Sequence, residues 1–397
     1  MKKILIVSGK AASLLLLLVL LVTTLSEFSP IYDFAPPHPF DGPDIYDPYA
    51  SVDTTWGWKR ANFHTHTRVD GIFNECPEYP DVVYDDYMKL GYDILSFSNH
   101  NRLTRHPYDS TLQVNVYEHG INLFKFHKLV FNPSRMIRHD PLLPLLPSQK
   151  QFEYDYLSRN ADFICMNHPD RTDMMTPESM RRLTGYRLME ADSGPSTELF
   201  RWDEALSAGH YSHCLTDDDC HDSGNHRRIG IRCSWQNVPD ATYASLKESL
   251  LLGRFYSMRV PDYGDGDWDE KYRRNAELPG ITAIGARGDT LFIELTAPAE
   301  WIKAVGQGHV TLDSLPDTRR LAHVMTADEP YVRFSARFPD GVYIYSNAFA
   351  RYDSKAAQTP YVDAPHSVNI LLTLLFNLGL LAIAVLCVLA AAGLVKH

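Results

Sequence analysis

The apolar positions of this 397-residue chain fall into three patterns. Both ends carry long runs without a charged side chain, at 11–26 and 367–395. Between about residues 61 and 258, short apolar runs of strand length alternate with helical signals, and from 278 to 352 the helical signals stop. Alternation of strands with helices favours an α/β fold with a mainly parallel sheet or barrel.

Four helices are predicted in the alternating region from the residues that start and stop them. Pro80 begins the first and Gly91 ends it. The second runs from Thr176 to Gly185, and the others cover 198–208 and 241–252, each followed by glycine. Proline in a first turn and glycine after a last turn are the usual boundary signals of a helix.

The region 278–352 is predicted to be β-rich. Its segments 291–295, 331–336 and 342–345 carry alternating, β-branched or aromatic residues, with Gly and Pro turns between them. Such spacing is typical of a small β-sandwich or β-rich appendage that follows an α/β unit.

The two apolar ends predict a membrane-anchored, exported protein. Lys2, Lys3 and Lys10 precede the first run, which is typical of a signal peptide or an uncleaved anchor. The run 367–395 is long enough to cross a bilayer as one helix, and Lys396 behind it favours a cytoplasmic tail. The alternative is a buried hairpin of core helices.

The net charge argues against one class of partner, and the cysteines limit the possible disulfides and metal sites. A net charge of −11 argues against nucleic acid as a partner, because a phosphate-neutralising surface needs clustered Lys and Arg. Of six cysteines, Cys387 lies in the last apolar run, and the remaining five permit one or two disulfides but form no metal knuckle.

Histidine is concentrated in the alternating region. Twelve of the 17 histidines lie between His64 and His226, and apolar runs there end in metal-binding residue types. The strand ends carry His64 and His66, His100, Glu118, His127, His168, Glu190, and Asp219 with His221. Since the carboxyl ends of parallel strands share one rim, these side chains are predicted to converge there and, except for Glu190, to bind two or three metal ions. Glu190 either faces this site or forms an ion pair on the rim.

The motifs resemble those of the polymerase and histidinol phosphatase (PHP) family of metal-dependent hydrolases over residues 57–260. They are H-x-H with D-G (His64, His66, Asp70, Gly71), S-N-H where the family has T-D-H (Ser98, Asn99, His100), Glu118, His127, the pair His168-Pro169, and D-x-H (Asp219, His221). The glycine-containing segment 253–256 and the β-rich region are most similar to the branch that contains carbaryl-type ester hydrolases.

The resemblance implies a distorted (β/α)7 barrel that holds up to three divalent ions of Zn, Mn or Fe. In that arrangement His64, His66, Glu118 and Asp219 bind the first ion, Glu118 with His127 and His168 the second, and Asp70, His100 and His221 the third. The nucleophile would be a metal-activated hydroxide rather than a side chain. Asn99 departs from the family pattern and removes a carboxylate next to His100.

The predicted organisation is therefore a signal peptide or anchor at 1–26, a linker at 27–55, a PHP metallohydrolase domain at 56–265, a β-sandwich-like appendage at 278–352 and a transmembrane helix at 367–395. The catalytic body is expected on the extracytoplasmic side of the membrane. The sequence leaves the oligomeric state open.

The cationic residues near the motifs favour a small anionic ester as substrate. Arg171, His226 and Arg228 are predicted to bind a phosphoester, because a guanidinium holds phosphate oxygens well. Two alternatives remain open, a carboxyl ester or carbamate hydrolase of the same fold and a non-catalytic, metal-stabilised binding ectodomain. Four other histidines are expected to be structural or exposed: His119, His139, His210 and His213.

Overall fold

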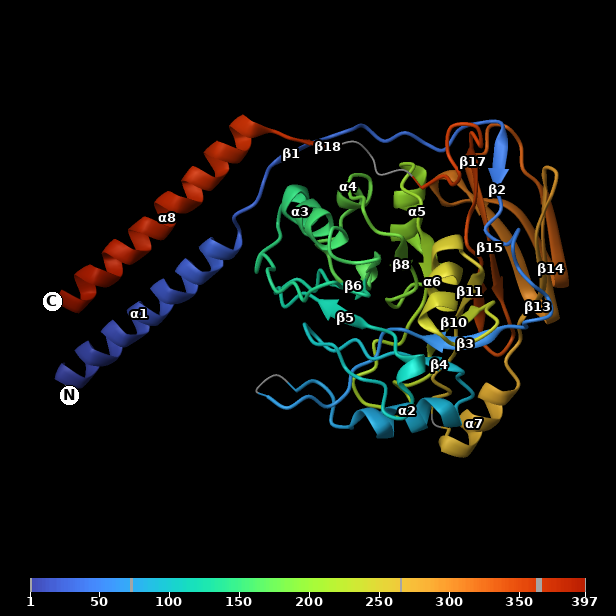
Figure 1. The fold of residues 1–397 in the computed structure, drawn as a ribbon, viewed down its shortest axis with the longest axis horizontal. Helices are drawn as coiled ribbons and strands as arrows, with labels where there is room; N and C mark the ends of the chain where they lie inside the picture. The colour runs from blue at the N-terminus through green and yellow to red at the C-terminus, as the bar shows by residue number, and fades with distance from the viewer. Residues whose placement is uncertain (1, 72–73, 265, 362–365, 397) are drawn as a thin grey trace.

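The computed structural model describes residues 2–71, 74–264, 266–361 and 366–396. It has a mixed α/β body from which two helices, α1 (Lys2–Ser26) and α8 (Ile370–Lys396), project side by side (Figure 1). The predicted α/β class and the two apolar terminal helices are thereby confirmed. Both ends of the chain lie at the tips of these helices, away from the body.

A five-stranded sheet forms one side of the body, in the order β5–β6–β7–β8–β9. Its strands are β5 (Val116–His119), β6 (Lys128–Phe131), β7 (Phe163–Met166), β8 (Leu188–Glu190) and β9 (His213–Leu215). The pairs β7–β8 and β8–β9 are parallel, whereas β5–β6 and β6–β7 are antiparallel. The expected parallel arrangement therefore holds for only part of this sheet, because β6 returns directly from β5 through a short loop.

A second sheet of eleven strands follows the order β12–β13–β15–β16–β11–β10–β3–β4, with β14 on β13 and β17 between β15 and β2. The strands in this path are β3 (Lys59–Asn62), β4 (Ile94–Leu95), β10 (Arg232–Gln236), β11 (Phe255–Arg259), β12 (Ile281–Arg287), β13 (Thr290–Gly306), β15 (Tyr331–Arg337) and β16 (Tyr343–Tyr345). The other three are β2 (Asp44–Tyr46), β14 (Val310–Val324) and β17 (Phe349–Tyr352). Because β16 pairs with β11, the β-rich region extends the sheet of the preceding region rather than forming a separate layer.

The two sheets meet at the carboxyl ends of their strands. A parallel bridge joins His100, after β4, to Glu118 in β5, and another joins Thr65, after β3, to Cys220, beyond β9. The ends of β3, β4, β5 and β9 therefore share one rim. These pairings do not form the closed ring of parallel strands that a regular (β/α) barrel has.

Within the described residues the body contains six helices, four of which correspond to the four predicted ones. They are α2 (Pro80–Lys89), α3 (Pro147–Ser158), α4 (Pro177–Met180), α5 (Phe200–Ser207), α6 (Tyr243–Leu252) and α7 (Trp268–Ala276). Short 3₁₀ turns lie at Ser110–Leu112, Pro169–Arg171 and Gln307–His309. Helix α4 is shorter than predicted because the Thr184 N–H donates to the Gln151 side chain at 3.0 Å instead of to a helix carbonyl.

Glycine is required at the end of α6. Gly253 has a φ of +79°, and a Cβ there would lie 2.4 Å from the His213 ring. The left-handed residue stops the helix and turns the chain into β11, which runs beside β10.

The segment 27–55, predicted to be an extended linker, packs against the body. Its strand β2 pairs with β17, and Phe40 and Tyr46 are buried in the core beside Tyr211. Strand β1 (Tyr32–Phe34) pairs antiparallel with β18 (His366–Val368), so the chain segments next to the two terminal helices are hydrogen-bonded to each other.

Helix α8 begins at Ile370, three residues later than the predicted span, because residues 366–368 belong to β18. Asn369 caps the helix, since its side-chain oxygen accepts the Leu372 N–H at 3.0 Å. Two windows are long and apolar enough to cross a membrane, Ser8–Ser26 and Ile370–Val395, and little of their surface is buried against protein. The Ile31 N–H donates to Thr373 Oγ1 at 2.9 Å, which ties the two chain ends together.

The cysteines form no disulfide bond in the described part of the structure. All six cysteines, each in a described part of the chain, are free and buried. The disulfides that an oxidising compartment would permit are absent from these positions. Apolar packing and the continuous sheet therefore stabilise the body instead.

Replacing Ile344 by alanine should destabilise the body by about 2–5 kcal/mol. Ile344 is fully buried and lies in β16 opposite Met258 and Ala336, so the truncation leaves a cavity where the two parts of the large sheet join. Urea unfolding in detergent micelles measures the difference. Val324→Ala, at a 60% exposed position, is the control and should change stability by less than about 0.5 kcal/mol.

Candidate metal centre

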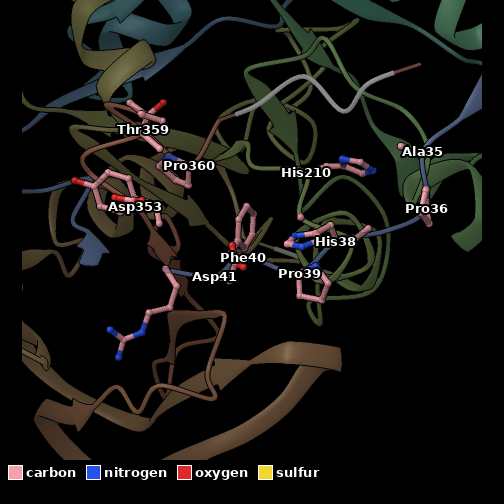
Figure 2. Close-up of a pocket in the computed structure, with 16 residues that line it drawn as sticks. Ala35, Pro36, His38, Pro39, Phe40, Asp41, His210, Asp353, Thr359 and Pro360 are labelled. Atoms are coloured by element: carbon pink, nitrogen blue, oxygen red, sulfur yellow. The ribbon is translucent and has the colours of Figure 1, made fainter. Parts of the chain in front are cut away.

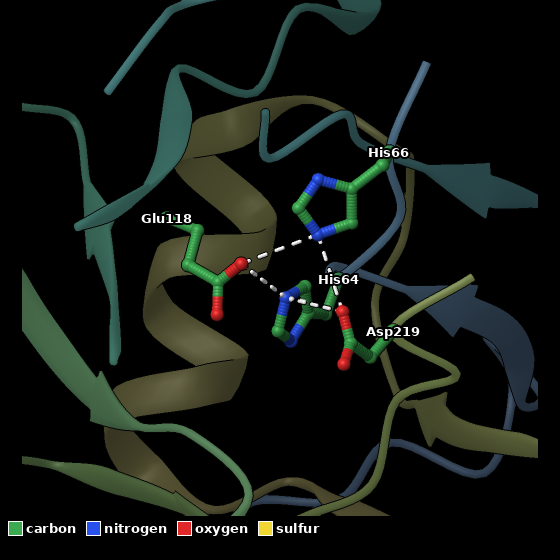
Figure 3. A group of neighbouring side chains, drawn as sticks. All are labelled: His64, His66, Glu118 and Asp219. Atoms are coloured by element: carbon green, nitrogen blue, oxygen red, sulfur yellow. Dashed lines mark hydrogen bonds and ion pairs between the residues drawn. The ribbon is translucent and has the colours of Figure 1, made fainter. Parts of the chain in front are cut away.

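Four side chains from three chain segments bring their donor atoms together at the shared rim. His64 and His66 follow β3, Glu118 lies in β5, and Asp219 follows β9. Their ligand atoms all lie within 4.8 Å of one another (Figure 3). Glu118 Oε2 lies 3.1 Å from His64 Nε2 and 3.2 Å from His66 Nε2, and Asp219 Oδ1 lies 3.1 Å from both nitrogens.

This spacing fits a bound metal ion. Ligand bonds of about 2.0–2.2 Å place neighbouring ligand atoms about 2.8–3.6 Å apart around one ion, from octahedral to tetrahedral angles. Among the described residues, His64 Nε2 and Glu118 Oε2 are buried atoms without a hydrogen-bond partner. Buried polar atoms are normally satisfied, so these two point to a ligand that completes them. The donor set fits a divalent cation.

Glu118 also faces a second group of nitrogens through its other oxygen. Oε1 lies 3.1 Å from His127 Nδ1 and 3.1 Å from His168 Nε2, and it accepts the Asn167 amide at 3.0 Å. Asn167 Oδ1 in turn accepts the Leu129 N–H, which fixes the amide between β7 and β6. One carboxylate thus stands between two groups of imidazoles, the arrangement of a bridging metal ligand.

A third group contains a carboxylate that the sequence analysis did not identify. Glu75 Oε2 lies 3.3 Å from His100 Nε2, 3.8 Å from His66 Nδ1 and 3.9 Å from His221 Nε2. Asp70, the residue predicted from the motif, is exposed, and its backbone oxygen accepts a hydrogen bond from Arg102 at 3.5 Å. The loop after His66 therefore presents Glu75, not Asp70, to the histidines.

Glu190 holds two of the predicted ligands in position. Its Oε1 lies 2.6 Å from His64 Nδ1, and its Oε2 accepts the His168 N–H at 2.8 Å. The Nδ1–H of His64 is thereby directed away from the cluster, which leaves Nε2 free to bind an ion. The sequence placed Glu190 at a strand end but could not distinguish this position from an ion pair on the rim.

The three consecutive aspartates after β9 have different partners. Asp217 accepts the Phe63 N–H at 2.8 Å and fixes the end of β3. Asp218 accepts three backbone N–H groups of residues 230–232 and the Tyr87 hydroxyl. Asp219 alone extends to the cluster, where its second oxygen pairs with Arg171.

Two predicted ligands have left-handed backbone conformations. The φ angles are 28° at His168 and 51° at Asp219, and neither residue is glycine. Such conformations are unfavourable for side-chain-bearing residues and are concentrated at functional sites. Here they follow the ends of β7 and β9, where the chain turns and directs each side chain toward Glu118.

The cluster's charges favour cation binding. Burial by itself would raise the pKa of Glu118, but His64 and His100 more than offset this effect and hold the pKa well below its ordinary value. Asp219, likewise buried, has a pKa held well below its ordinary value by His64. Both carboxylates are therefore anionic at neutral pH, and metal binding would compete with protons for the imidazoles.

Asn99 stabilises the backbone beside His100. Its side-chain oxygen accepts the Thr67 N–H at 2.9 Å, and its amide donates to the hydroxyls of Thr67 and Thr104. This side chain links the loops after β3 and β4. Asn99, which stands where the T-D-H motif has aspartate, thus places a neutral side chain beside the third group of ligands.

Only one of the three predicted substrate-binding residues lies at the cluster. Arg171 pairs with Asp219 and donates to the Ser193 carbonyl at 2.7 Å. The His226 ring bonds the Gly266 carbonyl at 2.6 Å, and Arg228 is exposed. Neither of these two contacts a cluster residue in the described part of the chain, because the turn after His221 leads them away toward α7.

The histidines expected to be structural bond to the backbone or lie at the surface. The rings of His119, His210 and His213 bond the carbonyls of His139, Arg181 and Leu251, respectively. His139 is exposed. A cavity of about 540 Å³, lined by residues such as His38, Phe40 and Arg351, lies elsewhere in the body, and no cluster residue lines it (Figure 2).

No family model matches the chain, and no curated protein matches it either. Among solved structures, one similar chain is a two-domain protein from Bacteroides vulgatus containing a predicted PHP-like metal-dependent phosphoesterase, 15% identical, with a TM-score of 0.37 over 80% of this chain and 100% of that one. Another is a lesion-specific endonuclease from Pyrococcus furiosus, 14% identical, with a TM-score of 0.31 over 49% of this chain and 56% of that one. These values are low, so the side-chain geometry carries the functional interpretation.

Replacing Glu190 by glutamine should weaken metal binding by about 10- to 100-fold, because the amide no longer fixes the ring orientation of His64 as a carboxylate does. Chelator competition followed by elemental analysis measures the affinity. Glu178→Gln, on the exposed face of α4, is the matched control and should bind metal like the unchanged protein. Equal affinity in both variants would contradict the positioning role.

Glu75 and Asp70 can be distinguished by metal content. The Glu75→Ala variant should bind about one metal ion per chain less than the unchanged protein, because the substitution removes the carboxylate that faces His100 and His221. Asp70→Ala should retain the full content. The opposite result would return the third group to Asp70, as the motif predicted.

Proposed function

We propose that this protein is a membrane-anchored, metal-dependent phosphoesterase of the PHP type. The observation that carries the proposal is the bridging position of Glu118, whose two oxygens each lie 3.1 Å from imidazole nitrogens of different groups. Paired ligand groups around one buried carboxylate are the arrangement that places divalent ions next to each other. The short strands β3 to β9 around this rim would correspond to the distorted PHP barrel.

The first ion would be held by His64, His66, Glu118 and Asp219, the second by Glu118, His127 and His168, and a third by His100, His221 and Glu75. Zn, Mn and Fe all suit imidazole and carboxylate ligands. When bound, such ions polarise an ester oxygen and activate water for attack. The protein's own contribution is to hold the ligand groups in position, with Glu190 orienting His64 and Asn167 orienting Glu118.

Arg171 supports a phosphoester over a neutral substrate. Its guanidinium pairs with Asp219 at the edge of the cluster, and the side chain is 29% exposed, so a substrate could reach it from solvent. A guanidinium stabilises a phosphate oxygen that does not react, whereas a carbamate would gain little from it. A small anionic ester is therefore the proposed substrate.

Membrane anchoring is supported by the exposed apolar surfaces of α1 and α8. The two helices run in opposite directions, so both chain ends lie on the same side of any membrane they cross (Figure 1). Lys2, Lys3, Lys10 and Lys396 all belong to these ends. Because positive charge is retained in the cytoplasm, the body would lie on the extracytoplasmic side, with α1 as an uncleaved anchor.

The metal-loaded protein should hydrolyse phosphoesters faster than carboxyl esters or carbamates. Glu118→Ala should abolish turnover together with metal binding. Arg171→Ala should raise KM for phosphoesters by about tenfold, the loss of one charged hydrogen bond. Arg228→Ala is the control, since that exposed arginine has no contact with the cluster within the described residues. Steady-state kinetics on a panel of esters measures both.

Efficient cleavage of carbamates with no turnover of phosphoesters, and a silent Arg171→Ala, would favour the carbamate hydrolase. Stoichiometric metal without turnover of any ester would favour a metal-stabilised binding domain. Less than one transition-metal ion per chain would contradict the metal centre itself.

A further inference from the structure

Exposed apolar side chains lie on a loop that joins two candidate metal ligands. Residues 120–127 connect Glu118 in β5 to His127, just before β6. On this short loop, Ile121 is 59% exposed and Leu123 is 75% exposed. Single exposed apolar side chains are common on protein surfaces, but several of them grouped in one patch usually mark a contact surface.

A second loop extends this apolar surface. The Leu123 N–H donates to the Leu142 carbonyl at 3.2 Å, and the Ile121 N–H donates to Asp140 at 2.5 Å. Leu145 and Leu146, three and four residues after Leu142, are 53% and 38% exposed. The exposed residues of the two loops, Ile121, Leu123, Leu145 and Leu146, are called the apolar lip below.

The same loop is bonded to the end of the apolar helix α1. The Leu142 N–H donates to Ser26 Oγ at 3.1 Å, and the Leu143 N–H donates to Glu27 Oε1 at 2.7 Å. Ser26 is the last residue of α1. In Figure 1 the segment before α3 correspondingly lies on the side of the body from which α1 and α8 project. The apolar lip therefore lies at the level where α1 would leave the bilayer.

The exposed Lys, Arg, Asp and Glu side chains between residues 120 and 146 of the chain are all positive. They are Lys125, Arg135 and Arg138, whereas Asp140 and Lys128 are buried. The whole chain, by contrast, has a net charge of −11. Apolar side chains flanked by cations fit the headgroup region of an anionic leaflet.

We propose that the metal centre acts on lipid phosphoesters presented by the membrane in which the protein is anchored. This inference rests on the proposed function and names its substrate class. The apolar lip would contact the acyl region of the leaflet, and the headgroup phosphate would reach the rim beside His127, whose side chain is 13% exposed. Hydrolysis breaks one P–O bond to the leaving alcohol and forms one to the oxygen of water; one proton of water goes to the alcohol and the other to solvent.

The test compares each lipid with its deacylated counterpart, using the full-length metal-loaded protein in phosphatidylcholine vesicles. The pairs are phosphatidic acid with glycerol 3-phosphate, and phosphatidylglycerol with glycerophosphoglycerol. At least one lipid should be hydrolysed faster than its counterpart. The double variant Ile121→Glu, Leu123→Glu should lower the ratio of lipid to deacylated rate by about tenfold, because the charged side chains oppose contact with the acyl region.

Val310→Glu is the matched control, because Val310 is 55% exposed and belongs to β14, a strand on the side of the body away from α1 and α8 (Figure 1). It should leave the ratio unchanged. If the deacylated esters are hydrolysed as fast as the lipids and the double variant keeps the same ratio, the lipid inference is wrong while the phosphoesterase proposal stands. If no phosphoester of either kind is hydrolysed, both are overturned.

A measurement that needs no turnover tests the membrane contact separately. A nitrobenzoxadiazole label on Leu123→Cys should be quenched by doxyl-labelled lipids in the vesicles, and the same label on Val310→Cys should not. The six native cysteines are buried, and the unchanged protein supplies the labelling blank. Absence of quenching at Leu123→Cys would overturn the contact between the apolar lip and the bilayer, whatever the enzyme assays give.

Discussion

A buried carboxylate surrounded by imidazoles constrains the rest of this structure. Glu118 is 1% exposed, and its two oxygens lie 3.1–3.2 Å from nitrogens of five histidines. A charge in such a position is stable only with positive charge beside it, and those partners come from the ends of different strands. The parallel bridges beside Glu118 and beyond β9 hold these ends at one rim. The metal centre and the joining of the two sheets therefore depend on the same residues.

The candidate site and the two apolar terminal helices are physically connected. The loop that separates Glu118 from His127 bonds to the segment at Leu142, and that segment bonds to the last residue of α1. The pairing of β1 with β18 ties the start of α8 to the same end of the body. These hydrogen bonds consequently fix the position of the rim relative to α1 and α8, so no flexible linker separates them. A membrane-borne substrate would meet an entrance already oriented toward it.

Most of the candidate site follows from local sequence signals. His64 and His66 share one face because of the two-residue period of a strand, and Glu118, His168 and Asp219 end short apolar runs. Glu75 had no such signal, because it lies in a long loop whose path depends on contacts with His100 and His221. For the same reason Arg171 and Arg228 looked equivalent in the sequence, although only Arg171 extends to Asp219.

The sequence by itself determined the α/β class, the helix boundaries marked by proline and glycine, the β-rich region and the two apolar ends, since each depends on residues close together in the chain. Tertiary structure alone decided that β5, β6 and β7 pair antiparallel, that β16 continues the sheet of β11, and that residues 27–55 pack as part of the body. Strand pairing and side-chain direction arise from contacts between distant residues, and periodicity carries no information about which strand becomes the neighbour.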